Sequence, residues 1–271
     1  MVVFPNCKIN LGLNIIRRRS DGYRDIETVF YPVHFFDALE VISGDKNFQF
    51  TLSGLQIDGD VSSNLCVKAF ELVKKDFPQI ASIKMHLHKT ISAGAGLGGG
   101  SSDAAFTLKL LNQKFDLGLT TEKLLDYALQ LGSDCPFFII NKPCFASGRG
   151  EFLETIRLDL SSYKFVIVNP SIHVSTAWAF SHTIPTKPTT SIKEIIQQPV
   201  ENWKMNLKND FEETVFKQYP SIKNIKEELY NAGAAYSSLS GSGSTVYALF
   251  EKNKEVKLNF PPNYFIKELN S

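Results

Sequence analysis

Five glycines lie within seven residues, from Gly94 to Gly100, between a strand pattern and a helix pattern. Residues 83–89 alternate apolar and polar with period two, which is typical of a half-buried strand. Residues 104–113 then carry apolar side chains at helical spacing. Side chains that could cap this helix stand just before it: Ser101, Ser102 and Asp103. Converging glycine amides at a helix N-terminus predict an anion-binding nest, and a nucleoside triphosphate is its natural occupant.

The glycine segment does not match the common phosphate loops. No lysine follows the glycines as a Walker A loop requires, and the protein-kinase motifs HRD and DFG are absent from the sequence. Gly94, Gly96 and Gly99 satisfy G-x-G-x-x-G, but the acidic residue expected about 20 positions later in a dinucleotide fold is only loosely supplied by Asp116. A flexible glycine turn is the structural alternative.

Charge and composition restrict the partners. The formal net charge is +1, which differs from the strongly basic balance of nucleic-acid binders. Four widely spaced cysteines without CxxC spacing favour a reducing cytoplasm over a disulfide framework. No segment approaches the roughly 20 apolar residues of a spanning helix, and the N-terminus lacks the order of a signal peptide. We therefore expect a soluble cytoplasmic protein without nucleic-acid or membrane partners, either a monomer or a weak homodimer.

The hydrophobic pattern predicts an α+β fold with mixed sheets. Strands are expected at 2–17, 26–42, 48–57, 83–89 and 165–168, with a strand–turn–strand unit at 137–158. Helices are expected at 65–77, 104–113, 121–131, 192–197, 201–217 and 221–232, and a loop at 183–190. A polar stretch near residue 160 predicts two lobes, an ATP-binding lobe over 1–158 and a C-terminal lobe over 159–271.

Two charged residues stand out as candidates for chemistry. Lys8 lies in an apolar strand pattern, where an unpaired ammonium would be costly, so an anionic partner is expected. Asp134 follows a helix end and precedes Pro136, where a carboxylate can be held rigidly; it is the expected partner and a candidate general base. The alternatives are a solvated lysine at a strand edge and an aspartate that caps the next helix. His86 and His88 share a strand face, but without a third ligand we interpret them as surface residues.

Three sequence blocks resemble the GHMP kinases, the family named for galactokinase, homoserine kinase, mevalonate kinase and phosphomevalonate kinase. The central block is 96–105, GLGGGSSDAA; the others are KINLGL at 8–13 with Asp21-Gly22-Tyr23, and LGSDCPFF at 131–138. Residues 239–244, LSGSGS, resemble the third motif of the family. The resemblance implies a two-lobed fold, with a ribosomal-protein-like α/β lobe followed by a ferredoxin-like lobe.

The resemblance also implies an activity. It suggests an ATP-dependent kinase that phosphorylates the 2-hydroxyl of a methylerythritol linked to cytidine diphosphate, in isoprenoid precursor biosynthesis. Asp134 matches the catalytic aspartate of the family, and Lys8 is expected to steady the charge on the transferred phosphoryl group. Magnesium is expected with ATP, although no residue is assigned as its ligand.

Further site residues follow from the same resemblance. ATP is expected to bind at Gly94, Ala95, Gly96, Leu97, Gly98, Gly99, Gly100, Ser101 and Ser102, with Asn64 and Lys89 near the adenine. The cytidyl substrate is expected to contact Asn10, Tyr23, Arg24, Thr176 and Phe180. Tyr23 and Phe180 are placed to stack on the cytosine, and Arg24 stands where many relatives carry a histidine that contacts the base. Ser101 and Ser102 could act as caps, phosphate ligands or a magnesium ligand, and Phe180 could equally be a core residue.

Three other functions stay open from the sequence. A GHMP kinase could act on a different small alcohol, and a non-catalytic sensor could keep the loop without the chemistry. A dinucleotide-dependent oxidoreductase is the third alternative. The pairing of Lys8 with Asp134 favours a catalyst over a sensor.

Overall fold

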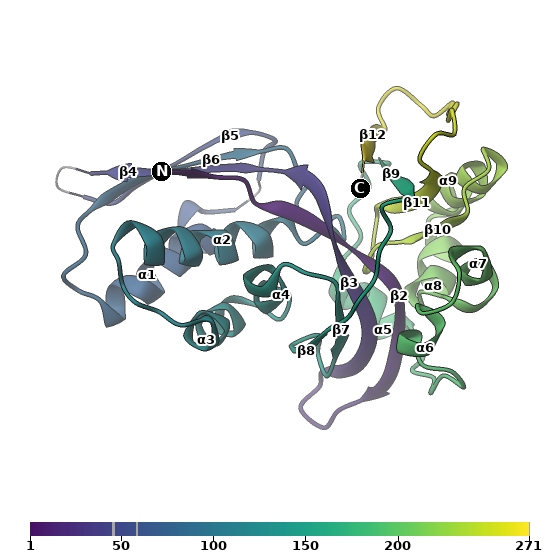
Figure 1. Ribbon diagram of the computed structural model, residues 1–271, viewed down its shortest axis with the longest axis horizontal. Coiled ribbons are helices and arrows are strands. Elements are labelled where there is room, and N and C mark those ends of the chain that lie inside the picture. The colour runs from purple at the N-terminus through teal and green to yellow at the C-terminus, as the bar shows by residue number, and fades with distance from the viewer. Residues whose placement is uncertain (45–46, 58, 271) are drawn as a thin grey trace. The chain divides into compact units, whose positions relative to one another are not determined.

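The computed structural model describes residues 1–44, 47–57 and 59–270. Within them the chain forms two compact units, and both are discontinuous in sequence (Figure 1). The first unit contains residues 1–7, 35–93 and 98–142, and the second contains residues 8–34, 94–97 and 143–271. No helix in the described ranges has the length and apolarity needed to span a bilayer.

The first unit is built on a sheet with strand order β1-β4-β6-β5. Its strands are β1 (Val2–Val3), β4 (Ala38–Ser43), β6 (Ile83–Lys89) and β5 (Gln49–Gly54). β6 pairs antiparallel with β4 and parallel with β5. The period-two alternation of β6 buries Ile83, Met85 and Leu87 on one face, and the same alternation buries Lys89 at the end of the strand. A lysine therefore ends an otherwise apolar row.

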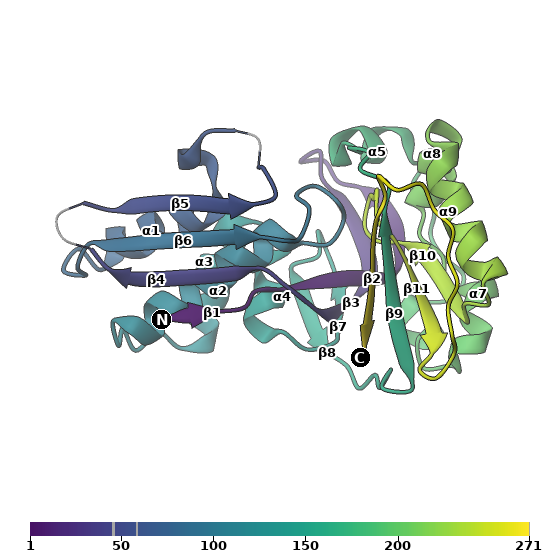
Figure 2. The same cartoon turned by 90° about the horizontal axis from the view of Figure 1, so that it is seen from above.

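Four helices cover one face of this sheet (Figures 1 and 2). They are α1 (Leu65–Asp76), α2 (Gly99–Lys114), α3 (Thr121–Leu131) and α4 (Cys135–Ile140), and the short helix η1 (Val61–Ser63) precedes α1. The side chain of Asn64 caps α1 by accepting a hydrogen bond from the backbone N–H of Cys66 at 2.9 Å. Helix α1 packs against α2, and α2 contacts β4. The ion pair between Lys89 and Asp103 joins the end of β6 to the start of α2.

The second unit contains two four-stranded sheets. One has the order β2-β3-β7-β8 and contains β2 (Asn6–Arg18), β3 (Arg24–Phe36), β7 (Cys144–Ser147) and β8 (Phe152–Thr155). The other is antiparallel with the order β10-β11-β9-β12, and contains β9 (Tyr163–Asn169), β10 (Tyr236–Leu239), β11 (Val246–Glu251) and β12 (Phe265–Asn270).

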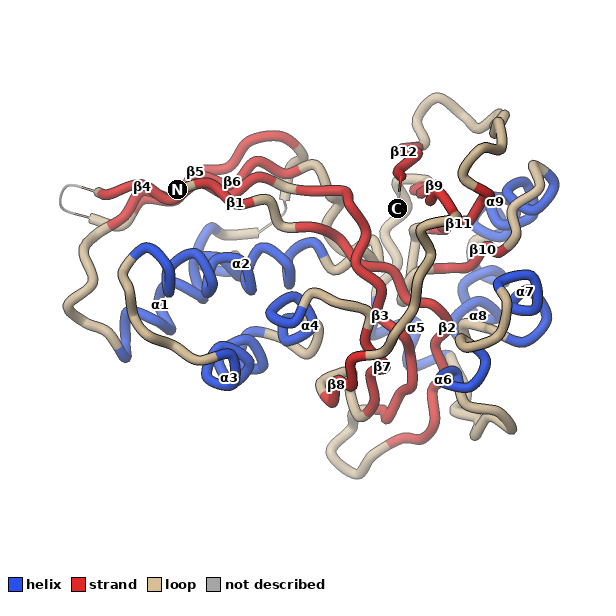
Figure 3. The backbone as a smooth tube through the Cα atoms, in the orientation of Figure 1, coloured by secondary structure: helices blue, strands red, loops and turns tan. Residues whose placement is uncertain are grey.

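The helices of the second unit lie between β9 and β10 in the sequence and are drawn in blue in Figure 3. They are α5 (Thr176–His182), α6 (Ile192–Ile195), η2 (Val200–Asn202), α7 (Trp203–Asn206), α8 (Phe211–Gln218) and α9 (Pro220–Asn231). α8 and α9 pack against the β10-β11-β9-β12 sheet in a core that includes Val166, Phe211 and Ile225. The predicted α+β class is confirmed.

Several predicted boundaries were wrong. The strand predicted at 26–42 is interrupted at Asp37, where β3 gives way to β4. The first part of the strand–turn–strand unit predicted at 137–158 is the helix α4, and the helix predicted at 201–217 is broken between residues 206 and 211. The helix predicted to begin at Ala104 begins at Gly99. Its N-cap is Gly98 at φ 69°, so Ser101, Ser102 and Asp103 lie inside the helix and do not cap it.

Candidate functional site

In the second unit, the first half of the glycine segment lies against the turn after β10. The hydroxyl of Ser240 donates to the backbone oxygen of Gly96 at 2.8 Å, and the backbone N–H of Thr245 donates to that of Ala95 at 3.3 Å. A Cβ on Gly96 would lie 1.9 Å from the backbone oxygen of Ser240, and the Gly96 φ of +80° is itself unfavourable for other residues. Glycine is required at position 96 on both grounds.

The same turn and loop lie beside two buried polar residues of β2, Lys8 and Asn10. Lys8 is 3% exposed, and its ammonium donates to the Asn10 side-chain oxygen at 2.6 Å and to the Gly96 backbone oxygen at 3.1 Å. The Asn10 amide donates in turn to the hydroxyl of Thr28 at 3.0 Å. Lys8 is therefore a buried residue and the solvated alternative is wrong. The structure brings Lys8 and Asn10 together with the glycine segment; Asp134 as the anionic partner of Lys8 stays a prediction.

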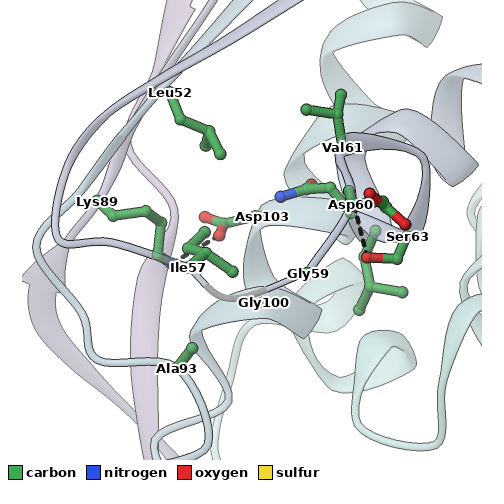
Figure 4. A pocket seen from close by; sticks show the side chains of 12 residues that line it. Leu52, Ile57, Gly59, Asp60, Val61, Ser63, Lys89, Ala93, Gly100 and Asp103 are labelled. Carbon is green, nitrogen blue, oxygen red and sulfur yellow. Dashed lines mark hydrogen bonds and ion pairs between the residues drawn. The ribbon is translucent and has the colours of Figure 1, made fainter.

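In the first unit, a pocket opens beside the N-terminus of α2 (Figure 4). Its lining residues are Leu52, Ile57, Gly59, Asp60, Val61, Ser63, Asn64, Leu65, Lys89, Ala93, Gly100 and Asp103. Apolar side chains form much of the wall, while Asp60, Lys89 and Asp103 supply charge. Because Gly100 lies in the first turn of α2, the pocket adjoins N–H groups that an anion can accept from. The arrangement suits an aromatic ring that carries a phosphate chain.

A buried ion cluster lies at one side of this pocket. The Lys89 ammonium donates to Asp37 and, at 2.7 Å, to Asp103; all three side chains are at most 3% exposed. Asp37 also accepts the backbone N–H groups of Thr90 at 2.6 Å and Ile91 at 2.9 Å. Asp37 thus fixes both the ammonium and the chain that enters the glycine segment. Sequence reasoning missed Asp37, although a lone carboxylate within the apolar run 29–39 is the same signal that identified Lys8.

Burial raises the pKa of Asp103 to about 7, since desolvation and the negative charge of Asp37 outweigh the opposing effect of Lys89. The folded protein therefore keeps this proton at pH values where the unfolded chain has lost it. Stability contributed by the protonated carboxyl is present below about pH 4 and is lost as the pH rises through about 7.

We expect the loss of folding stability with rising pH to appear when wild type is compared with Asp103→Asn, which keeps the side-chain shape but does not titrate. The melting temperature of wild type should fall relative to that of the variant between pH 5 and pH 8. A difference that stays constant with pH, or rises, would contradict the raised pKa. Calorimetric melting in a series of buffers measures it.

The predicted base lies at the start of α4. Asp134 occupies the N-cap position of this helix and is half-buried, yet its side chain makes no capping hydrogen bond, so the capping alternative is wrong. Burial raises the pKa of the neighbouring Cys135 thiol to about 12, a hydrogen bond with the Ser101 hydroxyl lowers it, and the charge of Asp134 raises it. Asp134 is therefore adjacent to a residue that contacts the first turns of α2.

Ser102 is the residue of α2 best suited to a metal-bound phosphate. It is fully buried, and its hydroxyl oxygen has no hydrogen-bond partner among the described residues. A hydroxyl oxygen is a ligand that Mg²⁺ accepts alongside water and phosphate oxygens. Within the described part of the chain, no group of three or more His, Cys, Asp or Glu side chains could hold a metal ion. A magnesium ion that arrives with ATP is therefore expected to be held mainly by phosphate oxygens and water.

The predicted substrate residues of the second unit are found in three pairwise contacts. The Arg24 guanidinium lies 5.8 Å from the ring centroid of Phe180, which packs edge-on against buried Phe211. Tyr23 is 53% exposed, and its ring is covered by the guanidinium of Arg149, 4.8 Å from its centroid. The hydroxyl of Thr176 lies 2.9 Å from that of Ser242. Phe180 is half-buried, so a core role and a substrate role are compatible.

Two further details concern these residues. Arg24 Nε is buried and has no hydrogen-bond partner among the described residues, so it is a donor in want of an acceptor. Arg149 and Ser240 were missed by sequence reasoning; Ser240 lay in the third glycine motif, and nothing in the sequence pattern signalled Arg149.

The two histidines of β6 lie in the first unit. The hydroxyl of Ser53 bridges His86 and His88 at 2.8 and 2.9 Å on the exposed face of β5 and β6.

Comparisons with known proteins agree with this geometry. The GHMP kinases N terminal domain model matches residues 64–142, and the GHMP kinases C terminal model matches residues 191–263. The 4-diphosphocytidyl-2-C-methyl-D-erythritol kinase of Bacteroides fragilis is 52% identical over 264 residues, 96% of each chain. That of Azobacteroides pseudotrichonymphae is 52% identical over 253 residues, covering 93% of this chain and 94% of the relative.

A crystal structure of 4-(cytidine 5'-diphospho)-2C-methyl-D-erythritol kinase matches with a TM-score of 0.81 and 29% identity, over 92% of this chain and 90% of the other. These matches confirm the predicted fold, in which both GHMP kinase domains are of the α+β class. The chain is therefore a GHMP kinase. Within that class it belongs to the family of 4-diphosphocytidyl-2-C-methyl-D-erythritol kinases.

Proposed function

We propose that this chain transfers the γ-phosphoryl group of ATP to the 2-hydroxyl of 4-diphosphocytidyl-2-C-methyl-D-erythritol, a step of isoprenoid precursor biosynthesis. The observation that carries the proposal is the pocket at the start of α2, where apolar walls adjoin the glycine amides of a helix N-terminus. An adenine in that pocket would direct its phosphates to those amides. Family membership supports the alcohol acceptor.

In the proposed reaction, the protein positions the two substrates and neutralises charge. Asp134 accepts the proton of the 2-hydroxyl as its oxygen attacks the γ-phosphorus, and ADP leaves. Lys8 stabilises negative charge on the transferred group, and Asn10 orients it so that its ammonium reaches the substrate. The roles of Asp134 and Lys8 are inferred from the resemblance of their motifs to those of the GHMP kinases. Magnesium, when bound, neutralises phosphate charge, and Ser102 is the residue proposed to help hold it.

The cytidyl end of the substrate is proposed to bind at Tyr23, Arg24, Thr176 and Phe180. Tyr23 offers an exposed ring for base stacking, and the unpaired Arg24 Nε offers a donor for a base carbonyl. An arginine stays charged at all working pH values, whereas a histidine at that position would not. Base recognition by Arg24 should therefore be insensitive to pH.

Tyr23→Ala is expected to raise the KM for the cytidyl substrate by about 5- to 140-fold, since stacking on an aromatic side chain contributes about 1–3 kcal/mol per base. The KM for ATP should stay unchanged. Phe152→Ala, which removes another exposed aromatic ring of the same unit, is the matched control. Steady-state kinetics with each substrate varied in turn makes the comparison, and an unaltered KM for the cytidyl substrate would remove Tyr23 from the site.

The substrate assignment is tested by profiling. ADP release with magnesium and ATP should depend on the cytidyl substrate, with a kcat/KM at least about 100-fold above the values for homoserine, mevalonate and galactose. A preference for one of those alcohols would favour the alternative of a GHMP kinase with a different acceptor. ATP binding without phosphoryl transfer to any alcohol would favour the sensor.

A further inference from the structure

A buried asparagine of the second unit holds the turn that follows β10. Asn209 is 2% exposed, and its side-chain amide donates to the backbone oxygens of Leu239 at 2.8 Å and Gly241 at 2.9 Å. These two carbonyl groups belong to the residues on either side of Ser240. The Asn209 side-chain oxygen accepts the backbone N–H of Phe211 at 3.0 Å, so the amide nitrogen must face the turn. Both amide protons are therefore used on the neighbours of Ser240.

This turn contacts two acceptors of the Lys8 ammonium. The Ser240 hydroxyl donates to the Gly96 backbone oxygen at 2.8 Å, and the same oxygen accepts from Lys8 at 3.1 Å. Gly241 lies against Asn10, because a Cβ on Gly241 would be 3.4 Å from the Asn10 side-chain oxygen. That oxygen accepts from the Lys8 ammonium at 2.6 Å. A displacement of the turn would therefore disturb both groups that hold Lys8.

The chain around this asparagine also fixes β2. The backbone N–H of Leu13 donates to the Lys208 oxygen at 2.8 Å, and that of Asp210 donates to the Leu13 oxygen at 2.8 Å. The Asp210 carboxylate accepts the backbone N–H of Ile15 at 2.7 Å. One short segment is thus bonded to β2, which carries the candidate catalytic lysine, and to the turn after β10, which contacts the acceptors of that lysine.

We propose that Asn209 is a positioning residue for phosphoryl transfer. It holds Ser240 and Gly241 in place, so that the Lys8 ammonium lies where negative charge develops on the transferred group. Asparagine suits this position because one short side chain must supply two N–H donors and an acceptor. The proposal rests on the proposed function, because it takes the role of Lys8 from that reaction. Asn209 itself touches no reacting atom.

The first test measures steady-state kinetics of Asn209→Ala at a temperature well below its melting temperature. Its kcat should fall by about 10- to 100-fold, because a small displacement of a charge-stabilising group slows the chemical step. The KM for ATP should stay within about 2-fold of wild type, since Asn209 does not line the pocket proposed for the nucleotide. A folded variant that keeps the wild-type kcat, or that changes only the KM for ATP, overturns the proposal.

Tyr236→Phe is the matched control for Asn209→Ala. The Tyr236 hydroxyl is fully buried in β10 and donates to the Leu207 backbone oxygen at 3.1 Å, close to the same segment but away from the turn. Its loss removes a buried hydrogen bond without releasing Ser240, so kcat should stay within about 2-fold of wild type. An equal fall in kcat for the two variants would show that Asn209 only stabilises the fold, which overturns the positioning role.

The second test asks whether Asn209 acts through Lys8. Lys8→Met keeps the apolar stem of the side chain without the ammonium. Adding Asn209→Ala to Lys8→Met should lower kcat by less than about 2-fold further, since residues that act as a unit are not additive. Losses that multiply overturn the proposal. If Asn209→Ala fails to fold, Ser240→Ala takes its place in the cycle; if Lys8→Met shows no turnover, the first comparison decides alone.

A measurement without substrate separates this proposal from the proposed function. The Asn10 backbone N–H donates to the Ser240 hydroxyl at 3.3 Å, so it reports on the turn. Hydrogen–deuterium exchange followed by NMR should show this amide exchanging at least about 10-fold faster in Asn209→Ala than in Tyr236→Phe. Equal exchange rates would remove the role of Asn209 whatever the reaction. Faster exchange in a protein that phosphorylates no cytidyl substrate would keep the hold on the turn and remove the proposed function.

Discussion

Asp134→Asn is expected to lower kcat by about 10²- to 10⁴-fold, the usual contribution of a general base. The amide keeps the shape of the side chain but cannot accept the hydroxyl proton. Because asparagine has nearly the same shape as aspartate and is equally favourable at the N-cap position of a helix, the substitution should leave the fold intact. The affinity for ADP should also be unchanged, since Asp134 does not line the pocket that we propose for the nucleotide.

Asp126→Asn provides the control for this prediction, because it removes an exposed carboxylate from α3 in the same unit. Single-turnover measurement of ADP formation, paired with calorimetric titration of ADP, separates chemistry from binding. A fall in kcat of less than about 10-fold would show that Asp134 is not the general base. Equal loss of turnover and of ADP affinity would instead indicate a structural role.

Gly96→Ala is expected to disable the enzyme through the backbone. The φ of +80° costs a non-glycine residue about 1–2 kcal/mol, and the added Cβ would lie 1.9 Å from the Ser240 backbone oxygen. The loop must move to relieve that contact, which also displaces the Gly96 oxygen that Lys8 and Ser240 hold. A displacement of about 1 Å in a positioning segment can lower turnover by about 100-fold.

Gly118→Ala is the matched control for Gly96, because Gly118 has a similar φ of +66° with nothing within 4 Å of its added Cβ. Both variants place an alanine at an unfavourable positive φ, but only the Cβ of Gly96→Ala also clashes with a neighbouring backbone oxygen. We expect Gly118→Ala to lose a few degrees of melting temperature with full activity, and Gly96→Ala to lose about 5 °C or more together with its activity. Equal effects of the two variants would show that the contact with Ser240 is unimportant.

The sequence predicted the elements on either side of the glycine segment better than it predicted their boundaries. The strand at β6 and the helix after the glycines were expected because their periodicities differ sharply. The first turn of α2 was missed because Gly99 and Gly100 are poor helix formers. Packing overrides that propensity: a Cβ on Gly99 would lie 2.8 Å from a methyl carbon of Ile91, so the helix can start there only with glycine.

The sequence also identified some of the buried charged residues and missed others. Lys8 was identified because a lysine in an apolar strand demands a partner, and the structure buries it as expected. Asp37 and Asp103 were not identified as partners of Lys89, because pairs separated by 52 and 14 residues meet only after the strands and α2 have packed. The cover that Arg149 provides for the Tyr23 ring is likewise a product of the tertiary fold.

The identity of the product tests the central claim most directly. Phosphorus NMR of a reaction containing ATP, magnesium and 4-diphosphocytidyl-2-C-methyl-D-erythritol should show one equivalent of ADP for each new phosphomonoester, with the phosphate on the 2-oxygen of the methylerythritol. ADP accompanied only by inorganic phosphate, or a monoester on another hydroxyl, would contradict the account.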